Sequence, residues 1–330
     1  MLTGFSLSGI PDNSFHVLPQ KTADLLKLFS ETPLDFEPGT KYNYCNTRYW
    51  FLGQLIERIS GMSYAQFMQD NIFVPLGMFN TGVDLDKPIV KGLATGYYLN
   101  HNDIIRCNYV NMDLGAEAGS MYSNAEDLLK WHVALMGDKL LGRESIDKMN
   151  TDNMNNYGYG VEVLEDNGKP IVEHGGGYEG FYAYLSRRLD DDFAGTTISN
   201  YGFGCGELVL NNAIRDITLG NPYEMPAKPP VHEIDINLLN GYIGKYEEVN
   251  IDYELKRVGD ELHLIYNKYC NAPAVFTVYP ISDTELQHTW TDETFDLGKT
   301  DDGIPTLNGI KKSDITIDNI TLMGGKYGLT

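Results

Sequence analysis

The period of the apolar residues changes along this chain, and that change limits the fold more than any other feature. Between Thr47 and Gly61 the apolar residues follow the i, i+3, i+4, i+7 spacing of a helix face. These residues are Leu52, Leu55, Ile56 and Ile59. From Tyr157 onward they lie in short segments rich in β-branched and aromatic side chains. This change predicts a mixed α/β (α+β) chain, with helices first and a β-rich second half.

Three further helices are expected from their start and stop signals. Ser63 is placed to cap a second helix, which the turn Pro75-Leu-Gly77 would end. A third helix follows the capping box Ser123-x-x-Glu126. A last helix is expected over 207–217. Its predicted apolar face consists of Leu208, Leu210, Ile214 and Ile217.

Strand segments dominate the second half of the chain. They are first expected at 157–164, 170–174, 181–189 and 193–199. A proline-rich linker follows over 222–233. Beyond it every segment is strand-like, with repeated Gly and Asp turns. We therefore expect a mixed domain over 1–221 and a separate small all-β domain, a sheet or barrel, over 234–330.

Composition excludes several classes of partner. The net charge of −21 argues against nucleic acid and anionic membranes, because phosphate binding depends on Lys and Arg. No apolar run approaches the length of about 18 residues that spans a bilayer. The four cysteines form no C-x-x-C pair, and no metal site or cofactor is expected. No signal peptide is visible, and localisation and oligomeric state stay open.

Two short motifs are candidates for chemistry. In Tyr44-x-Asn46 the phenol could move a proton if a neighbouring cation acidified it, and the amide could bind substrate. Alternatively, Asn46 is a helix N-cap and Tyr44 one of 22 tyrosines. In His174-Gly175-Gly176-Gly177 the glycines would leave backbone N–H groups open to a substrate oxyanion. The alternative there is a glycine-rich hairpin turn beside an ordinary histidine.

The order of the motifs is more specific than any one of them. Phe36-Glu-Pro-Gly39, Tyr44-Cys-Asn-Thr47, Ser60-Gly-Met-Ser-Tyr64 and Ile72–Met78 occur in sequence. They are followed by Ala118-Gly-Ser120 with Ser123 and Asp127, and by His174–Gly177 with Gly180-Phe181. This order resembles the serine β-lactamase-related family, which includes class C β-lactamases, penicillin-binding proteins, DD-peptidases and related esterases. The resemblance covers about residues 8 to 218. It implies an incomplete β-lactamase/transpeptidase-like α/β (α+β) domain, with an antiparallel sheet flanked by helices.

The resemblance implies acyl transfer through a covalent serine ester. It implies that Tyr44 assists proton transfer, that Asn46 binds substrate, and that His174, Gly175 and Gly176 replace a Lys-Thr-Gly motif. Gly177 N–H would be one oxyanion donor. The implied substrate is a small peptide, ester or β-lactam-like molecule, and family members are often exported. An imidazole carries less positive charge near pH 7 than a lysine, which favours an esterase or peptidase over a β-lactamase. The C-terminal domain resembles the lipocalin-like barrels that follow this domain in related proteins.

The family's Ser-x-x-Lys nucleophile is the motif that does not fit. It should lie upstream of Ser8, and the one match in the sequence, Ser145-x-x-Lys148, lies among polar residues and is interpreted as a solvated surface. Gly4–Ser8 is a near miss to the Gly-x-Ser-x-Gly elbow and has no preceding strand. We therefore expect an N-terminally truncated serine hydrolase that is inactive as given, or else a non-catalytic binding relative. An incomplete domain would leave the strand at 193–199 as an unpaired sheet edge.

Overall fold

The structure is a computed structural model in which two compact units are described separately. The first comprises Met1–Tyr98 and Ile105–Met225, and the second Leu99–Ile104 and Pro226–Thr330. The expected linker includes 225–229, which lies outside the described residues, as does the Gly4–Ser8 near miss. The described residues are 27, 33–34, 36–85, 89–100, 103–107, 109, 111–137, 140–178, 180–190, 193–201, 206–224, 230–248, 251–266, 274–288 and 293–313.

The first helices of the first unit follow the local signals in the sequence. Helix α2 (Thr47–Ser60) ends at Gly61, which adopts φ 71° and donates its N–H to the Glu57 carbonyl. Ser63 caps α3 (Tyr64–Met68) by accepting a hydrogen bond from Gln66 N–H, as expected. The helix continues through a π-helical segment (Gln69–Phe73) and α4 (Val74–Leu76). Helix α5 (Met112–Gly119) follows after the short hairpin of β2 (Tyr97–Asn100) and β3 (Asp103–Arg106).

The predicted capping box at Ser123 is wrong by one residue. Helix α6 (Ala125–Met136) is capped by Asn124, whose side chain accepts a hydrogen bond from Asp127 N–H. Ser123 is engaged elsewhere, since its Oγ lies 2.7 Å from Thr81 Oγ1. The pairing of β1 (Gly82–Val83) with β4 (Met121–Tyr122) brings Ser123 next to Thr81. This tertiary contact engages the Ser123 hydroxyl, and Asn124 caps α6 instead. Helix α7 (Arg143–Met149) comes next.

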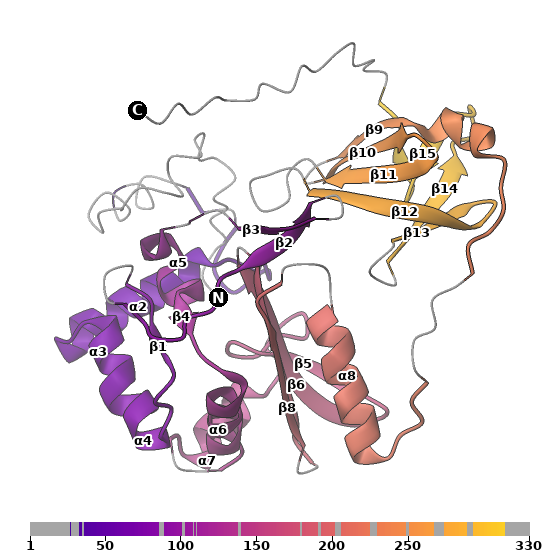
Figure 1. Ribbon diagram of the computed structural model, residues 1–330. Coiled ribbons are helices and arrows are strands. Elements are labelled where there is room, and N and C mark those ends of the chain that lie inside the picture. Colours follow the sequence, from indigo (N-terminus) through magenta and orange to yellow (C-terminus); the bar gives the residue numbers. More distant parts are fainter. Residues whose placement is uncertain are drawn as a thin grey trace, which may run out of the picture. The chain divides into compact units, whose positions relative to one another are not determined.

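A four-stranded antiparallel sheet forms the centre of the first unit, as the strand pattern predicts. Its order is β5 (Glu162–Asp166), β6 (Lys169–Tyr178), β7 (Phe181–Arg188) and β8 (Ala194–Ser199). In the described sheet β8 pairs only with β7, so it is an edge strand. Figure 1 shows α8 (Gly206–Leu219) on one side of the sheet and α6 and α7 on the other.

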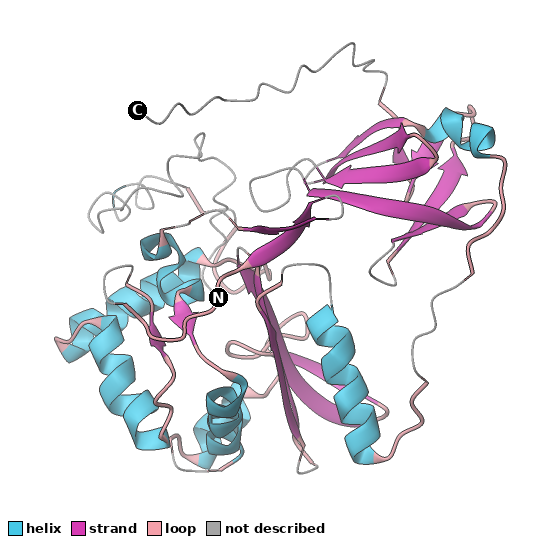
Figure 2. Ribbon diagram, in the orientation of Figure 1, coloured by secondary structure: helices cyan, strands magenta, loops and turns pink. Residues whose placement is uncertain are grey.

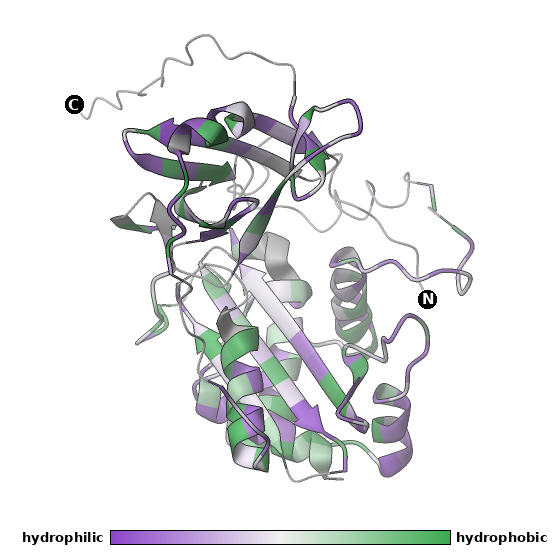
Figure 3. Ribbon diagram, turned by 90° about the vertical axis from the view of Figure 1, so that its right-hand side faces the viewer, coloured by the Kyte–Doolittle hydropathy of each residue, from purple (hydrophilic) through white to green (hydrophobic). Residues whose placement is uncertain are grey.

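The predicted apolar face of α8 is not the face that packs on the sheet. Leu210, Ile214 and Ile217 are exposed, whereas Asn211 is fully buried. Asn211 Oδ1 accepts a hydrogen bond from Ser186 Oγ on β7. At this position a hydrogen bond to β7 replaces the apolar contact that the sequence predicts. Figure 3 shows hydrophobic residues on the α8 surface that faces the viewer.

The second unit is an eight-stranded antiparallel sheet, which confirms the expected all-β domain (Figure 2). The single helical segment in its described part is a 3₁₀ turn over Ile236–Tyr242. The strands follow chain order: β9 (Gly244–Glu248), β10 (Ile251–Val258), β11 (Glu261–Tyr266), β12 (Ala274–Ser282), β13 (Glu285–His288), β14 (Thr294–Lys299), β15 (Pro305–Leu307) and β16 (Ile310–Lys311).

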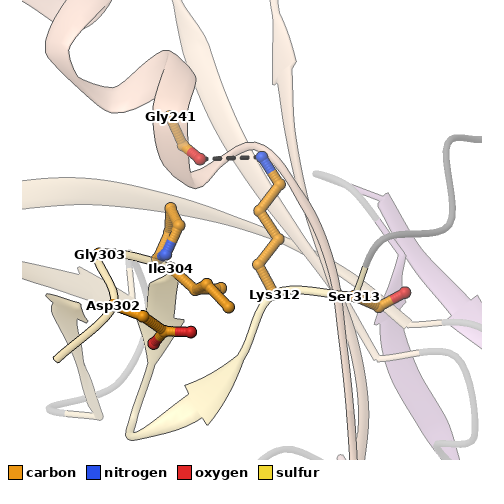
Figure 4. Close-up of a pocket in the computed structure, with 7 residues that line it drawn as sticks. Gly241, Asp302, Gly303, Ile304, Lys312 and Ser313 are labelled. Atoms are coloured by element: carbon orange, nitrogen blue, oxygen red, sulfur yellow. Dashed lines mark hydrogen bonds between the residues drawn. The ribbon is translucent and has the colours of Figure 1, made fainter. Parts of the chain in front are cut away.

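The first and last strands of this sheet meet and close it almost into a barrel. Tyr246 on β9 bridges to Lys312, and Ser313 N–H donates to the Lys245 carbonyl at 2.7 Å. Next to the closure, Lys312 Nζ donates to the Gly241 carbonyl at 2.8 Å beside a hollow lined by Asp302 and Ile304 (Figure 4). The interior is filled by Leu239, Tyr246, Leu255, Leu262, Leu264, Val278, Leu286, Phe295, Leu297, Leu307 and Ile310.

None of the helices within the described ranges combines the length and the apolar composition that crossing a membrane requires.

Candidate active site along strand β6

The glycine run continues strand β6 and is not the hairpin turn that was one interpretation of the sequence. The strand extends to Tyr178, and its residues from His174 to Tyr178 pair with Leu185 to Phe181 of β7. On the other side, pairing with β5 stops at Glu173. In the described sheet, one side of β6 therefore has no partner strand from His174 onward.

The alternation of hydrogen bonds fixes which N–H groups face this unpaired side. Asn167 (φ 52°) and Gly168 (φ 76°) form a two-residue turn between β5 and β6. The pair that flanks such a turn, Asp166 and Lys169, exchanges both backbone hydrogen bonds. Every second residue of β6 after Lys169 points its N–H the same way. Gly175 and Gly177 therefore direct their N–H groups to the side where β5 has ended.

The two faces of the glycine run differ. Gly175 and Gly177 lie opposite Tyr184 and Tyr182 of β7. A Cβ on Gly175 would lie 2.8 Å from the Tyr184 ring, and one on Gly177 would lie 2.5 Å from the Tyr182 ring. A Cβ on Gly176 would meet nothing within 4 Å. His174 and Gly176 share this second face, because strand residues alternate between faces. The β6 segment therefore presents an imidazole beside open space.

His174 is held by a tyrosine that the sequence analysis did not identify. The Tyr157 hydroxyl lies 2.9 Å from His174 Nε2. Tyr157 is 9% exposed, and Tyr49 of α2 is one of its neighbours. Burial, followed by the neighbouring Tyr49, raises the pKa of Tyr157, so the phenol stays protonated.

A glycine close to Tyr157 in the sequence, Gly160, marks the place where Tyr49 approaches. Gly160 adopts φ 79°, and a Cβ there would lie 3.0 Å from the Tyr49 hydroxyl. The sequence Tyr157-Gly-Tyr-Gly160 thus leaves room for the ring of Tyr49. The sequence alone does not show that α2 packs here, so Gly160 did not identify the contact in advance.

Tyr44 lies close to this group. Its ring centroid is 6.1 Å from that of His174 and 6.1 Å from that of Tyr157. The side chain is 47% exposed. Partial burial, then the neighbours Tyr49 and Tyr42, raise the pKa of Tyr44. The sequence analysis required a neighbouring cation that lowers the pKa of Tyr44. The described surroundings raise this pKa instead, so that condition is not met.

Asn46 precedes α2 but does not cap it with its side chain. Its backbone is helical (φ −63°, ψ −35°), and no side-chain capping hydrogen bond forms. Its carbonyl accepts from Tyr49 N–H at 2.9 Å. Asn46 thus occupies the N-cap position of α2 without a capping side-chain hydrogen bond, and the residue is exposed.

The Ser145-x-x-Lys148 match lies on the surface, as expected. Both residues are exposed on α7. Lys148 Nζ pairs with Glu144 Oε1 at 2.9 Å, so this amine is not directed at Ser145 as a base. Among the residues with a described position, no group of three or more His, Cys, Asp or Glu side chains could hold a metal ion.

Comparisons with known proteins point to one family. The Beta-lactamase family model matches residues 7–217. Penicillin-binding protein 4* of Bacillus subtilis is 29% identical over 235 residues, which cover 64% of this chain and 52% of that protein. D-aminopeptidase of Brucella ovis is 27% identical over 220 residues, covering 64% of this chain and 40% of the relative. The chain thus spans about half the length of these relatives, or less.

The fold agrees with a solved structure as well. The octameric penicillin-binding protein homologue from Pyrococcus abyssi aligns with a TM-score of 0.55 at 20% identity. The alignment covers 86% of this chain and 68% of that one.

Proposed function

The chain belongs to the Beta-lactamase family, and on this basis we propose that it hydrolyses amide or ester bonds of small acylated substrates. The proposed substrates are peptides, esters or β-lactam-like molecules, because the relatives include a penicillin-binding protein and a D-aminopeptidase. The proposed reaction is acyl transfer to a serine, followed by hydrolysis of the ester by water.

The observation that carries the proposal is the unpaired side of β6. Two backbone N–H groups, of Gly175 and Gly177, point to this side, and fixed N–H donors are what a tetrahedral oxyanion requires. A substrate carbonyl placed there would have its oxygen stabilised as the serine oxygen adds to the carbonyl carbon. Removing one such donor typically costs a factor of about 100 or more in rate.

The side chains next to this strand support roles in the same step. The serine proton is proposed to go to the lysine of the family's Ser-x-x-Lys motif. Tyr44 is proposed to pass its proton to the leaving amine or alcohol when the carbon–nitrogen or carbon–oxygen bond breaks, and to regain one from that lysine. His174 is proposed to bind a substrate oxygen, and Asn46 to bind a substrate amide. The raised pKa of Tyr44 supports a phenol that starts the step with its proton in place.

We propose further that residues 1–330 by themselves form no covalent intermediate with a substrate. The one Ser-x-x-Lys in the sequence is exposed, and its lysine is paired with Glu144. That observation also favours a second candidate function, in which the chain binds an acylated ligand without cleaving it.

Covalent labelling tests the first part of this proposal. The 330-residue chain is incubated with a fluorophosphonate and with a penicillin, and its intact mass is measured. We expect no mass increase, and an adduct mapped to any printed serine would refute the proposal. Lys148→Ala serves as a control, since an adduct at Ser145 that survives it would show that this lysine is not the base.

A chimera tests the hydrolase itself against the binding function. Placing a family Ser-x-x-Lys segment upstream of Ser8 supplies the remaining group that the mechanism needs. We expect ester hydrolysis in the chimera and a loss of about 100-fold or more in acylation rate for Tyr44→Phe. Tyr159→Phe, an exposed tyrosine, is the matched control. Equal rates for the chimera and its Tyr44→Phe variant would remove Tyr44 from the mechanism. Ligand binding without turnover would support the binding function.

A further inference from the structure

We propose that Tyr157 is a positioning residue that fixes the tautomer of His174, so that His174 offers an N–H donor to an oxygen of the substrate. The inference rests on the proposed function, because it assigns the direction of the hydrogen bond that His174 makes to a substrate. It concerns a residue outside the motifs that carry the family resemblance.

The geometry sets which ring nitrogen is occupied. The Tyr157 hydroxyl is 2.9 Å from Nε2, within hydrogen-bond distance. A phenol has one proton to donate, and a neutral imidazole has one nitrogen that accepts and one that donates. The tautomer of a histidine is set by the hydrogen bond that its other nitrogen makes.

The difference in basicity decides which way the proton points. The Tyr157 hydroxyl lies against Nε2 of His174. An imidazole nitrogen is a stronger base than a phenol oxygen, so the Tyr157 proton goes to Nε2.

The consequence is an imidazole with its proton on Nδ1. Because Nε2 accepts from Tyr157, Nδ1–H is the group left for a ligand. The chemical class that fits an N–H donor is an oxygen acceptor, namely a carbonyl or a carboxylate of the substrate. His174 then takes the place of the lysine found in many family members, and its Nδ1–H binds substrate oxygen as a hydrogen-bond donor.

The burial of Tyr157 explains why this arrangement is rigid. The residue is 9% exposed, whereas its neighbour Tyr159 is 66% exposed. Its backbone is held as well, because Asn153 N–H donates to the Tyr157 carbonyl at 3.0 Å. The rings of Tyr42 and Tyr44 lie 5.4 and 6.1 Å from its ring centroid. A side chain packed on several sides holds one rotamer, and this keeps its hydroxyl at Nε2.

Nitrogen NMR of the histidine rings tests the proposal directly. The full chain is labelled with ¹⁵N, and long-range proton–nitrogen spectra are recorded at a pH where the imidazoles are neutral. His174→Gln identifies the His174 signals among the seven histidines. We expect a protonated Nδ1 and an unprotonated Nε2. In Tyr157→Phe we expect the Nε2–H form to appear, and in Tyr159→Phe we expect no change.

Two results would overturn the proposal: a dominant Nε2–H form in the unmodified chain, or an unchanged tautomer in Tyr157→Phe. If Tyr157→Phe does not fold, the unmodified chain still decides, because a dominant Nε2–H form in it overturns the proposal without any variant.

A ligand titration separates this inference from the proposed function. N-acetyl-D-alanine carries both a carboxylate and an amide carbonyl, and it is the probe. We expect Tyr157→Phe to weaken its binding by about 10-fold, the equivalent of one hydrogen bond. If the probe does not bind but the Nδ1–H tautomer is present and depends on Tyr157, the positioning role stands and the proposed substrate class falls.

Discussion

The carboxylate of Asp127 accepts a hydrogen bond from the backbone N–H of Asn80, 47 residues earlier in the chain, at 2.7 Å. The same fully buried side chain accepts from Thr81 Oγ1 at 3.1 Å and pairs with Lys130 Nζ at 2.7 Å. One carboxylate therefore joins the start of α6 to the segment that precedes β1. Burial alone would raise the pKa of Asp127, but the hydrogen bonds from Lys130, Asn80 and Thr81 lower it.

Asp127→Ala should lower the free energy of unfolding by about 3 kcal/mol, because it removes the acceptor of the Asn80 N–H and of the buried Thr81 hydroxyl and the partner of Lys130. Glu126→Ala is the matched control, since Glu126 is exposed in the same helical turn, and it should change stability by less than about 0.5 kcal/mol. Urea denaturation measures both. Equal losses in the two variants would contradict the structural role of Asp127.

His132 should make the first unit sensitive to mild acid. It is 4% exposed, and burial, with nearby Arg187 adding to it, lowers its pKa to about 4 from 6.5. The unfolded chain binds more protons than the folded chain between these values, so stability is full above about pH 6.5 and falls toward pH 4. This group should cost about 2 kcal/mol between pH 7 and pH 5.

His132→Leu tests this loss by denaturation at both pH values. The variant should lose less stability than the unmodified chain on going from pH 7 to pH 5. The control is His232→Leu, at an exposed site paired with Asp283 in the second unit. Asp127 does not contribute to the pH dependence between pH 7 and pH 5. Its pKa is lowered in the folded chain, so its contribution to the free energy of unfolding is lost only below about pH 4. An unchanged pH dependence in His132→Leu would show that this histidine does not sense acid.

Two neighbouring glycines on β6 should respond very differently to the same substitution. Gly177→Ala places a methyl group 2.5 Å from the Tyr182 ring, so the ring must move, at a cost of about 1–2 kcal/mol. Gly176→Ala meets nothing within 4 Å and should be tolerated to within about 0.5 kcal/mol. Thermal unfolding of the pair measures the difference. A similar Tm for both variants would mean that Tyr182 does not cover Gly177.

The core of the second unit offers a test of its own. Leu264 is 1% exposed among the apolar interior residues, and Leu264→Ala should cost about 2–4 kcal/mol through the cavity that it leaves. Leu238→Ala, at a 66% exposed position of the same unit, is the control. Amide hydrogen exchange in β10 and β11 follows this unit specifically. Protection that survives Leu264→Ala unchanged would contradict the packing.

The features that the sequence predicted correctly depend on residues within one helical turn or one hairpin. Gly61 and Ser63 act on neighbours three or four residues away, so α2 and the start of α3 could be located. The strands followed from short β-rich segments separated by turn residues. The antiparallel sheet, and a shared region for Tyr44 and His174, were implied by the family resemblance that the order of the motifs carries. The roles of these two residues stay predictions.

The features that the sequence missed depend on distant contacts. Ser123 does not cap α6 because its hydroxyl lies beside Thr81. Helix α8 turns Asn211 to the sheet because Ser186 on β7 donates a hydrogen bond to it. Tyr157 meets His174 only once the chain between them has folded into β5 and β6. Periodicity counts apolar residues, and it carries no information about which polar group another segment will bring.

The closure of the second unit's sheet has a topological consequence. Because Ser313 hydrogen-bonds to Lys245, the last strand of the described sheet lies against the first, so its two ends are neighbours in space. A linker could join these ends, and new termini could be opened at the exposed Gly259-Asp260 turn between β10 and β11. Every strand pair of the sheet would survive such a circular permutation, because the order of strands around a closed ring does not depend on where the chain starts.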